Sequence, residues 1–215
     1  MSTGQRMPLW KGQEAARYLM KQWGMTEPAC MVVGSVRRER PDIGDVELIA
    51  PAAADKNADP IFDAMDRTID TPGLFGERKT PFCRPIRGFK RGFMACSLVA
   101  DLVGEDGFTY QIPVQVFRYA HDGANRGWTE LRCTGPGDFG RQVLIYWKKR
   151  FGIHHDQKAS IDDHLVDSLG NRVQTPTERS VFERLRIDYI EPKHRDAWIA
   201  DLLRAQTLNR REVFR

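Results

Sequence analysis

The sequence lacks several features that define specialised classes of protein. It has only four cysteines in 215 residues, and none of them forms a C-x-x-C pair, which argues against a disulfide framework and a zinc site. We expect reduced, mostly buried thiols. Its longest apolar runs, such as 143–147, are far shorter than the roughly 20 residues that cross a bilayer, so we expect no membrane contact. The opening residues MSTGQRMPLWKG have no apolar signal core, which favours a cytoplasmic protein.

Charge of one sign is not in large excess either. The 33 Lys and Arg are nearly balanced by 29 Asp and Glu, leaving a net charge of +4, so charge alone does not indicate nucleic-acid binding. The length and the 41% hydrophobic content fit one globular domain or two small ones and exclude a fibre or a repeat array. The segment 78–91 is the exception, because it contains six basic residues and no acidic one. On composition alone it could equally be a solvated loop.

The first half of the chain has the pattern of a mixed α and β unit. Apolar spacing predicts helices over 13–23 and near 61–69. Short apolar or alternating runs predict strands over 30–36 and 45–50, and a hairpin of two strands over 93–103 and 108–120. In the strand 45–50, alternation directs Asp45 and Glu47 to one face and the apolar residues between them to the other. Two carboxylates therefore project side by side.

The second half is predominantly helical in its pattern. A loop over 127–137 is expected to lead into a helix over 138–152, followed by a small hairpin turning near Gly170. Another helix is expected to open with Thr175 as its N-cap, with Glu178 closing a capping box. A final helix is predicted over 193–205.

The most specific motif is GSVRR at 34–38, which Asp45-x-Glu47 follows seven residues after Arg38. A strand ending in Gly-Ser lets the backbone approach a triphosphate, whose oxygens a hydroxyl and an arginine can bind. Two carboxylates on the adjacent strand can hold Mg²⁺ or Mn²⁺, which bridges to substrate phosphates. This chemistry serves nucleotidyl transfer, in which a hydroxyl attacks the α-phosphate and pyrophosphate leaves.

These residues resemble the DNA polymerase β superfamily of nucleotidyltransferases, and within it the family X DNA polymerases. The resemblance is carried by GSVRRERPDIGDVELI (34–49), FKRGFMACSL (89–98) with VQVFRY (114–119), CTGPGDFGRQVL (133–144) and TPTERSVFERLRIDYIEPKHRD (175–196). It implies an α+β fold: a palm subdomain over 1–122, with a mixed sheet and flanking helices, and a small, mostly helical closing subdomain over 123–215. The length further leads us to expect a chain without lyase or phosphoesterase domains, similar to the minimal phage, viral or bacterial members.

The resemblance also implies roles for individual residues. Asp45 and Glu47 fall at metal-binding carboxylates, Glu47 where polymerases usually have Asp. The third carboxylate position holds Gln115, a neutral residue, and Asp101 is expected to pair near Ile112, too far away to replace it. The implied nucleotide-binding residues are Gly34, Ser35, Arg38, Gly44, Thr134 and Gly135. The implied DNA-binding residues in the basic segment are Arg84, Arg87, Lys90 and Arg91.

Three functions stay open from the sequence. The first is a monomeric DNA polymerase or nucleotidyltransferase of the repair type, which adds nucleotides from dNTP to DNA ends or short gaps and is impaired by Gln115. The second is a nucleotide- and DNA-binding protein that has lost catalysis, and the third is a nucleotidyltransferase acting on RNA or protein. Elsewhere, His154, His155 and Asp156 are interpreted as solvated. Trp128, in the expected loop, is interpreted as a core residue, with substrate contact as the alternative.

Overall fold

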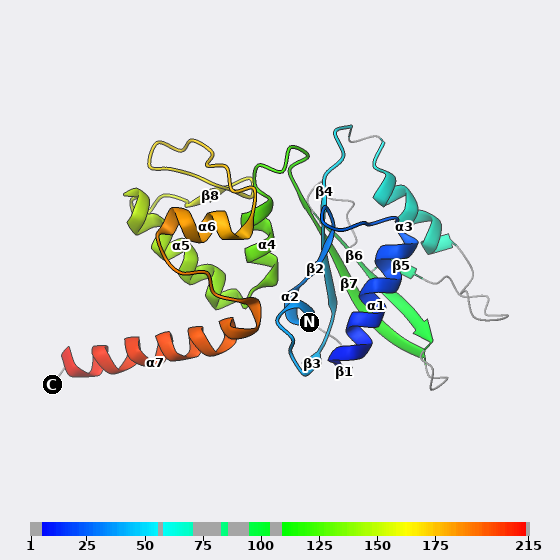
Figure 1. Cartoon of the computed structure of the whole chain (residues 1–215), viewed down its shortest axis with the longest axis horizontal. Coiled ribbons are helices and arrows are strands. Elements are labelled where there is room, and N and C mark those ends of the chain that lie inside the picture. The colour runs from blue at the N-terminus through cyan, green and yellow to red at the C-terminus, as the bar shows by residue number, and fades with distance from the viewer. Residues whose placement is uncertain (1–5, 56–57, 71–82, 86–94, 104–108, 214–215) are drawn as a thin grey trace.

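The structure is a computed structural model that describes residues 6–55, 58–70, 83–85, 95–103 and 109–213. A sheet with flanking helices occupies one side of the molecule and a group of helices occupies the other (Figure 1). The α+β class with a helical C-terminal part is thus confirmed. The boundary after residue 122 stays a prediction.

The main sheet has five strands in the order β2-β4-β7-β6-β5. They are β2 (Met31–Val33), β4 (Val46–Pro51), β5 (Cys83–Pro85), β6 (Ala95–Val103) and β7 (Thr109–Tyr119). The strands β4 and β7 run parallel and all the other pairs antiparallel, so the sheet is mixed and the predicted hairpin β6–β7 is present. A separate two-stranded sheet joins β1 (Met7–Pro8) to β3 (Asp42–Ile43).

Helices α1 (Leu9–Gln22) and α3 (Pro60–Asp70) confirm the two helices predicted in this half. α1 begins four residues before the predicted start. Both pack into one core with the even-numbered residues of the central strands, among them Leu48, Val114 and Val116, which are fully buried. Because strand side chains alternate, the odd-numbered Glu47 and Gln115 belong to the opposite face of the sheet.

The strand predicted over 30–36 is shorter than expected. It ends at Val33, and Gly34 begins the short helix α2 (Gly34–Arg37). Gly34 has a φ of +66°, a left-handed conformation that side-chain-bearing residues rarely adopt. The chain therefore leaves the sheet at Gly34, one residue before Ser35, the predicted phosphate-binding serine.

The second half is built from α4 (Arg126–Thr134), α5 (Gly137–Phe151), α6 (Glu178–Leu185), the 3-10 turn η1 (Pro192–His194) and α7 (Arg195–Val213). Its core contains Trp128, Phe139, Trp147 and Phe182. The loop expected over 127–137 is wrong, because most of it forms α4. Trp128 lies on this helix with 1% of its surface exposed, so it packs in the core, as the sequence interpretation favoured.

Of two further local predictions in this half, one is confirmed in part and the other is wrong. The chain does turn at Gly170, where Val166 and Arg172 form an isolated antiparallel bridge. A second hairpin, between β8 (Ser160–Ile161) and β9 (His164–Leu165), turns at residues 162–163, which both have positive φ. The N-cap of α6 is Thr177, whose hydroxyl accepts a hydrogen bond from the Ser180 amide in a capping box closed by Ser180. Glu178, expected to close that box, is buried and makes different contacts.

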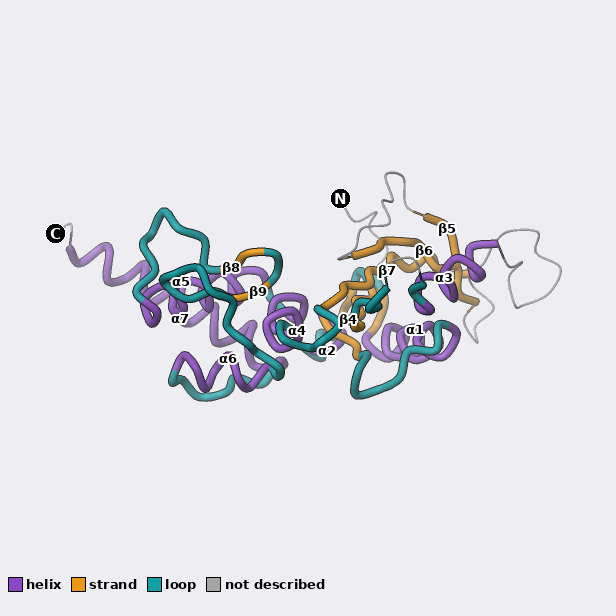
Figure 2. Tube along the Cα trace, turned by 90° about the horizontal axis from the view of Figure 1, so that it is seen from above, coloured by secondary structure: helices purple, strands orange, loops and turns teal. Residues whose placement is uncertain are grey.

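Seen from above, α2 and α4 lie between the sheet and the remaining helices (Figure 2). The predicted phosphate-binding segment is therefore at the junction of the two halves. Among the described residues, no helix has the length and apolar character to cross a membrane.

Candidate functional site

The two predicted metal-binding carboxylates lie at the start of β4. Asp45 is in the connection just before the strand and Glu47 is within it. Glu47 pairs with Val33 of β2 on one side and with Gln115 of β7 on the other. Three residues are thus adjacent across β2, β4 and β7: Val33, which precedes the Gly-Ser motif, Glu47, and Gln115 at the predicted third carboxylate position.

The electrostatics of this pair fit a cation site. Burial, and to a lesser degree the charge of Asp45, raises the pKa of Glu47 to about 7. Burial also raises the pKa of Asp45, while Arg38 opposes the shift of both carboxyls. Two carboxylates held together with insufficient positive charge favour protonation or a divalent cation. The donor set therefore suits Mg²⁺, an ion that takes oxygen ligands.

Gly34 borders the Glu47 carboxylate. A Cβ added to Gly34 would lie 1.8 Å from the Oε2 of Glu47, so a larger residue would require the Glu47 side chain to move. The hydroxyl of the next residue, Ser35, is buried and has no hydrogen-bond partner among the described residues, which leaves an orphaned donor. Gly44 precedes Asp45, and a Cβ there would meet nothing within 4 Å among the described residues. Gly34, Ser35 and Gly44 are thus the sequence neighbours and contacts that the structure gives to the predicted site.

In the described strands of the hairpin, no acidic residue is paired with Gln115 to replace the missing carboxylate. Ser97 is the β6 partner of Gln115, whereas Asp101 pairs with Gln111, one residue from the expected Ile112 and four residues from Gln115. In the described part of the chain, the metal-ligating residues that form a close group of three are the exposed His154, His155 and Asp156. All three side chains are exposed and follow α5, in agreement with their interpretation as solvated residues.

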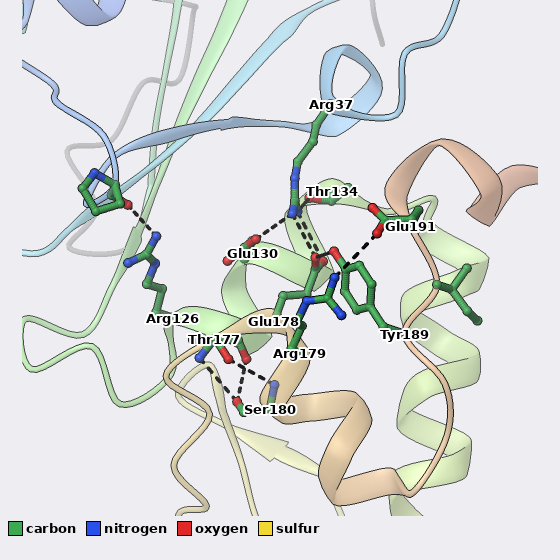
Figure 3. Close-up of polar contacts among 12 residues, drawn as sticks. Arg37, Arg126, Glu130, Thr134, Thr177, Glu178, Arg179, Ser180, Tyr189 and Glu191 are labelled. Carbon is green, nitrogen blue, oxygen red and sulfur yellow. Dashed lines mark hydrogen bonds and ion pairs between the residues drawn. The ribbon is translucent and has the colours of Figure 1, made fainter.

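A buried ionic network joins α2 to the helical half, and sequence reasoning assigned it no role (Figure 3). Arg37 donates hydrogen bonds to the hydroxyl of Thr134 at 2.7 Å, to Glu130 at 2.7 Å and to Glu178 at 2.9 Å. The last two are α4 and α6 carboxylates that are almost entirely buried. The only sequence signal for Arg37 was its place in an Arg-Arg pair.

Glu178 is the centre of this network. Besides Arg37, it forms an ion pair with the fully buried Arg195 at 2.8 Å, and it accepts a hydrogen bond from the Tyr189 hydroxyl at 2.7 Å. The Arg195 guanidinium also lies 4.9 Å from the ring centre of Phe139. Two carboxylates, Glu130 and Glu178, are thus balanced by two arginines, as buried charges require.

Arg38, Thr134 and Gly135 lie together, as the resemblance implies, but they contact one another. The Arg38 guanidinium donates to the backbone carbonyl of Thr134 and, at 3.0 Å, to the Asp196 carboxylate. A Cβ on Gly135 would lie 3.1 Å from Nη1 of Arg38. Their contacts here therefore connect the two halves.

The predicted DNA-binding residues are mostly outside the described residues. Arg87, Lys90 and Arg91 fall there, and Arg84 belongs to β5, where its backbone pairs with Val99 of β6. DNA contact by this segment stays a prediction.

The comparison with protein families concerns the helical half. Residues 130–196 match the family model described as DNA polymerase beta thumb. The match begins at Glu130 in α4, which contacts Arg37 of α2, and ends at Asp196 in α7, which contacts the next residue, Arg38. The comparison with curated proteins gave no match. The thumb match relates the helical half of this chain to polymerases of the β type and suggests a polymerase-like, DNA-binding protein.

Proposed function

We propose that this chain is a minimal family X-like DNA polymerase or nucleotidyltransferase that adds nucleotides from dNTP to DNA ends or short gaps. The observation that carries the proposal is the pairing of Glu47 with Gln115 across β4 and β7, directly beside the glycine turn at Gly34. The thumb match over 130–196 supports it from the other half. A polymerase needs both a nucleotide site and a surface for DNA.

The proposed roles follow from the chemistry of the donors. Asp45 and Glu47 would hold Mg²⁺, which when bound supplies positive charge to the triphosphate and to the departing pyrophosphate. The unpartnered Ser35 hydroxyl would donate to a phosphate oxygen, and Arg38 would neutralise phosphate charge. The basic segment 78–91 would hold the DNA backbone.

Gln115 limits the catalysis that we expect. An amide contributes at most a neutral carbonyl oxygen where the resemblance implies a carboxylate that completes the metal site and activates the attacking hydroxyl. Loss of one such interaction costs several kcal/mol of transition-state stabilisation, about 3 kcal/mol for a single oxyanion contact. Gln115 therefore favours a second candidate, a protein that binds nucleotide and DNA without efficient transfer.

Primer extension tests the proposal. The chain and its Gln115→Asp variant would be compared on gapped, nicked and blunt DNA with Mg²⁺ and with Mn²⁺. We expect weak extension by the natural chain and a gain of at least about tenfold in the variant, because a carboxylate restores a charged ligand. Gln111→Asp is the matched control, since Gln111 is an exposed residue of the same strand.

The outcomes separate the candidates. Rapid extension by the natural chain would contradict the role given to Gln115. No gain from Gln115→Asp, with nucleotide binding that still depends on Mg²⁺, would favour the binding protein. Labelled nucleotide on RNA or protein but never on DNA would favour a different acceptor. Nucleotide affinity that is the same with and without Mg²⁺ in calorimetry would contradict the metal site itself.

A further inference from the structure

The arginine proposed to bind phosphate already has an anionic partner in this structure. Nε of Arg38 donates to Oδ2 of Asp196 at 3.0 Å, and another guanidinium nitrogen donates to the Thr134 carbonyl. Only 14% of the Arg38 side chain is exposed, against 31% for Asp196. The guanidinium is thus mostly buried, and its Nε is hydrogen-bonded to the Asp196 carboxylate. A phosphate oxygen would accept the same charge-assisted hydrogen bond.

We infer that Asp196 competes with the triphosphate for Arg38 and so sets the nucleotide affinity of the site. This inference rests on the proposed function, because it takes the phosphates of a nucleotide as the ligand of Arg38. Asp196 is then a positioning residue, which acts on the nucleotide only through Arg38. Nucleotide binding replaces the carboxylate by phosphate oxygens at the same guanidinium.

The surroundings make this exchange feasible. Arg40 lies 3.8 Å from the same Oδ2 of Asp196, and about half of its side chain is exposed. The carboxylate therefore keeps a cationic neighbour when Arg38 turns away. The charge of Arg38 also lowers the pKa of Asp45 and Glu47 against the effect of burial. Arg38 therefore interacts electrostatically with the metal-binding pair as well as with α7.

The exchange does not require the two halves to separate. Arg37, the neighbouring residue, is bonded independently to Glu130, Thr134 and Glu178. Those bonds remain while Asp196 is displaced. A change of side-chain conformation at Arg38 and Asp196 is then sufficient, and the competition can be removed by altering Asp196 alone.

Calorimetry on the full chain tests the inference with two probes, Mg²⁺-dATP and Mg²⁺ with inorganic tripolyphosphate. We expect Asp196→Asn to bind both about twofold to fivefold more tightly, the range for release of one partly exposed ion pair. Asp201→Asn is the matched control, because Asp201 lies on the same helix and pairs only locally with Arg204. It should change neither affinity.

A double-mutant cycle excludes a merely structural effect. In an Arg38→Gln background, Asp196→Asn should give no gain, since the competing pair is already absent. An equal gain in that background would overturn the inference, as would unchanged affinity of Asp196→Asn in a natural chain that binds Mg²⁺-dATP. If neither the natural chain nor the variant binds either probe, the proposed function fails and this inference fails with it.

Discussion

Replacing the buried carboxyl of Glu47 by an amide should stabilise the metal-free protein at neutral and alkaline pH. The side chain lies against Gly34, inside the junction of β2, β4 and β7. Burial and the neighbouring Asp45 both disfavour its ionised form and raise its pKa to about 7. Glu47→Gln keeps the shape and removes the charge.

The magnitude and its sign follow from linkage. The pKa rises from an ordinary 4.5 to about 7 in the folded protein, and each pKa unit corresponds to about 1.4 kcal/mol. The folded state thus binds the proton more tightly, so the free energy of unfolding falls as pH rises from about 4.5 to about 7. Below this pH range the carboxyl is protonated in both the folded and the unfolded state, so it does not lower the free energy of unfolding. Above it, the ionised carboxylate costs about 3 kcal/mol, which Glu47→Gln should recover.

Urea unfolding of both proteins between pH 4 and pH 8.5, with EDTA present, measures this difference. We expect the two stabilities to converge near pH 4.5 and to diverge by about 3 kcal/mol above pH 7. Saturating Mg²⁺ should reduce the difference, because the ion stabilises only the natural carboxylate. Glu14→Gln, on the exposed face of α1, is the control. Equal stabilities at pH 8, or a difference that grows towards acid pH, would refute the reasoning.

Two further predictions concern stability. Glu178→Gln should destabilise the protein by about 3–5 kcal/mol, because two buried arginines lose their shared partner. In urea unfolding, a cost no greater than that of the exposed Glu183→Gln on the same helix would contradict it. Gly34→Ala should lower the free energy of unfolding by about 1–3 kcal/mol more than Gly24→Ala does. Both glycines have positive φ, so the backbone strain is shared, but only at Gly34 would the added Cβ meet a neighbour among the described residues, Glu47. Equal melting temperatures of the two alanine variants would argue against that contact.

The central strands could be predicted because their pattern is local. Alternation in residues 45–50 separated the acidic from the apolar positions, and the structure has Leu48 fully buried and Glu47 on the other face. The turn at Gly34 was not predicted, because the apolar run was expected to continue as a strand to residue 36. The parallel pairing of Glu47 with Gln115 is not a local pattern, and before the structure only the resemblance placed Gln115 at the third carboxylate position.

The helix α4 was missed because a tertiary contact determines one of its residues. Gly127 suggests a loop when the sequence is considered alone, but a Cβ there would lie 2.0 Å from the backbone carbonyl oxygen of Thr177. The glycine allows α4 to approach the start of α6, and it does not break the helix. Glu178 was misassigned for a similar reason, since its partner Arg37 is 141 residues away in the sequence.

The two adjacent arginines at the end of α2, Arg37 within the helix and Arg38 just after it, have different environments and are therefore expected to have different roles at the junction. Arg37 is bonded to three groups of the helical half, and two buried carboxylates fix it there. Among the described residues, Arg38 is hydrogen-bonded to one side-chain anion, Asp196, at the edge of the same junction. Replacing a partner of Arg37 should therefore affect folding, whereas replacing Asp196 should affect ligand affinity. The thumb-like half can thus stay attached to the sheet through Arg37 while Arg38 exchanges its anion.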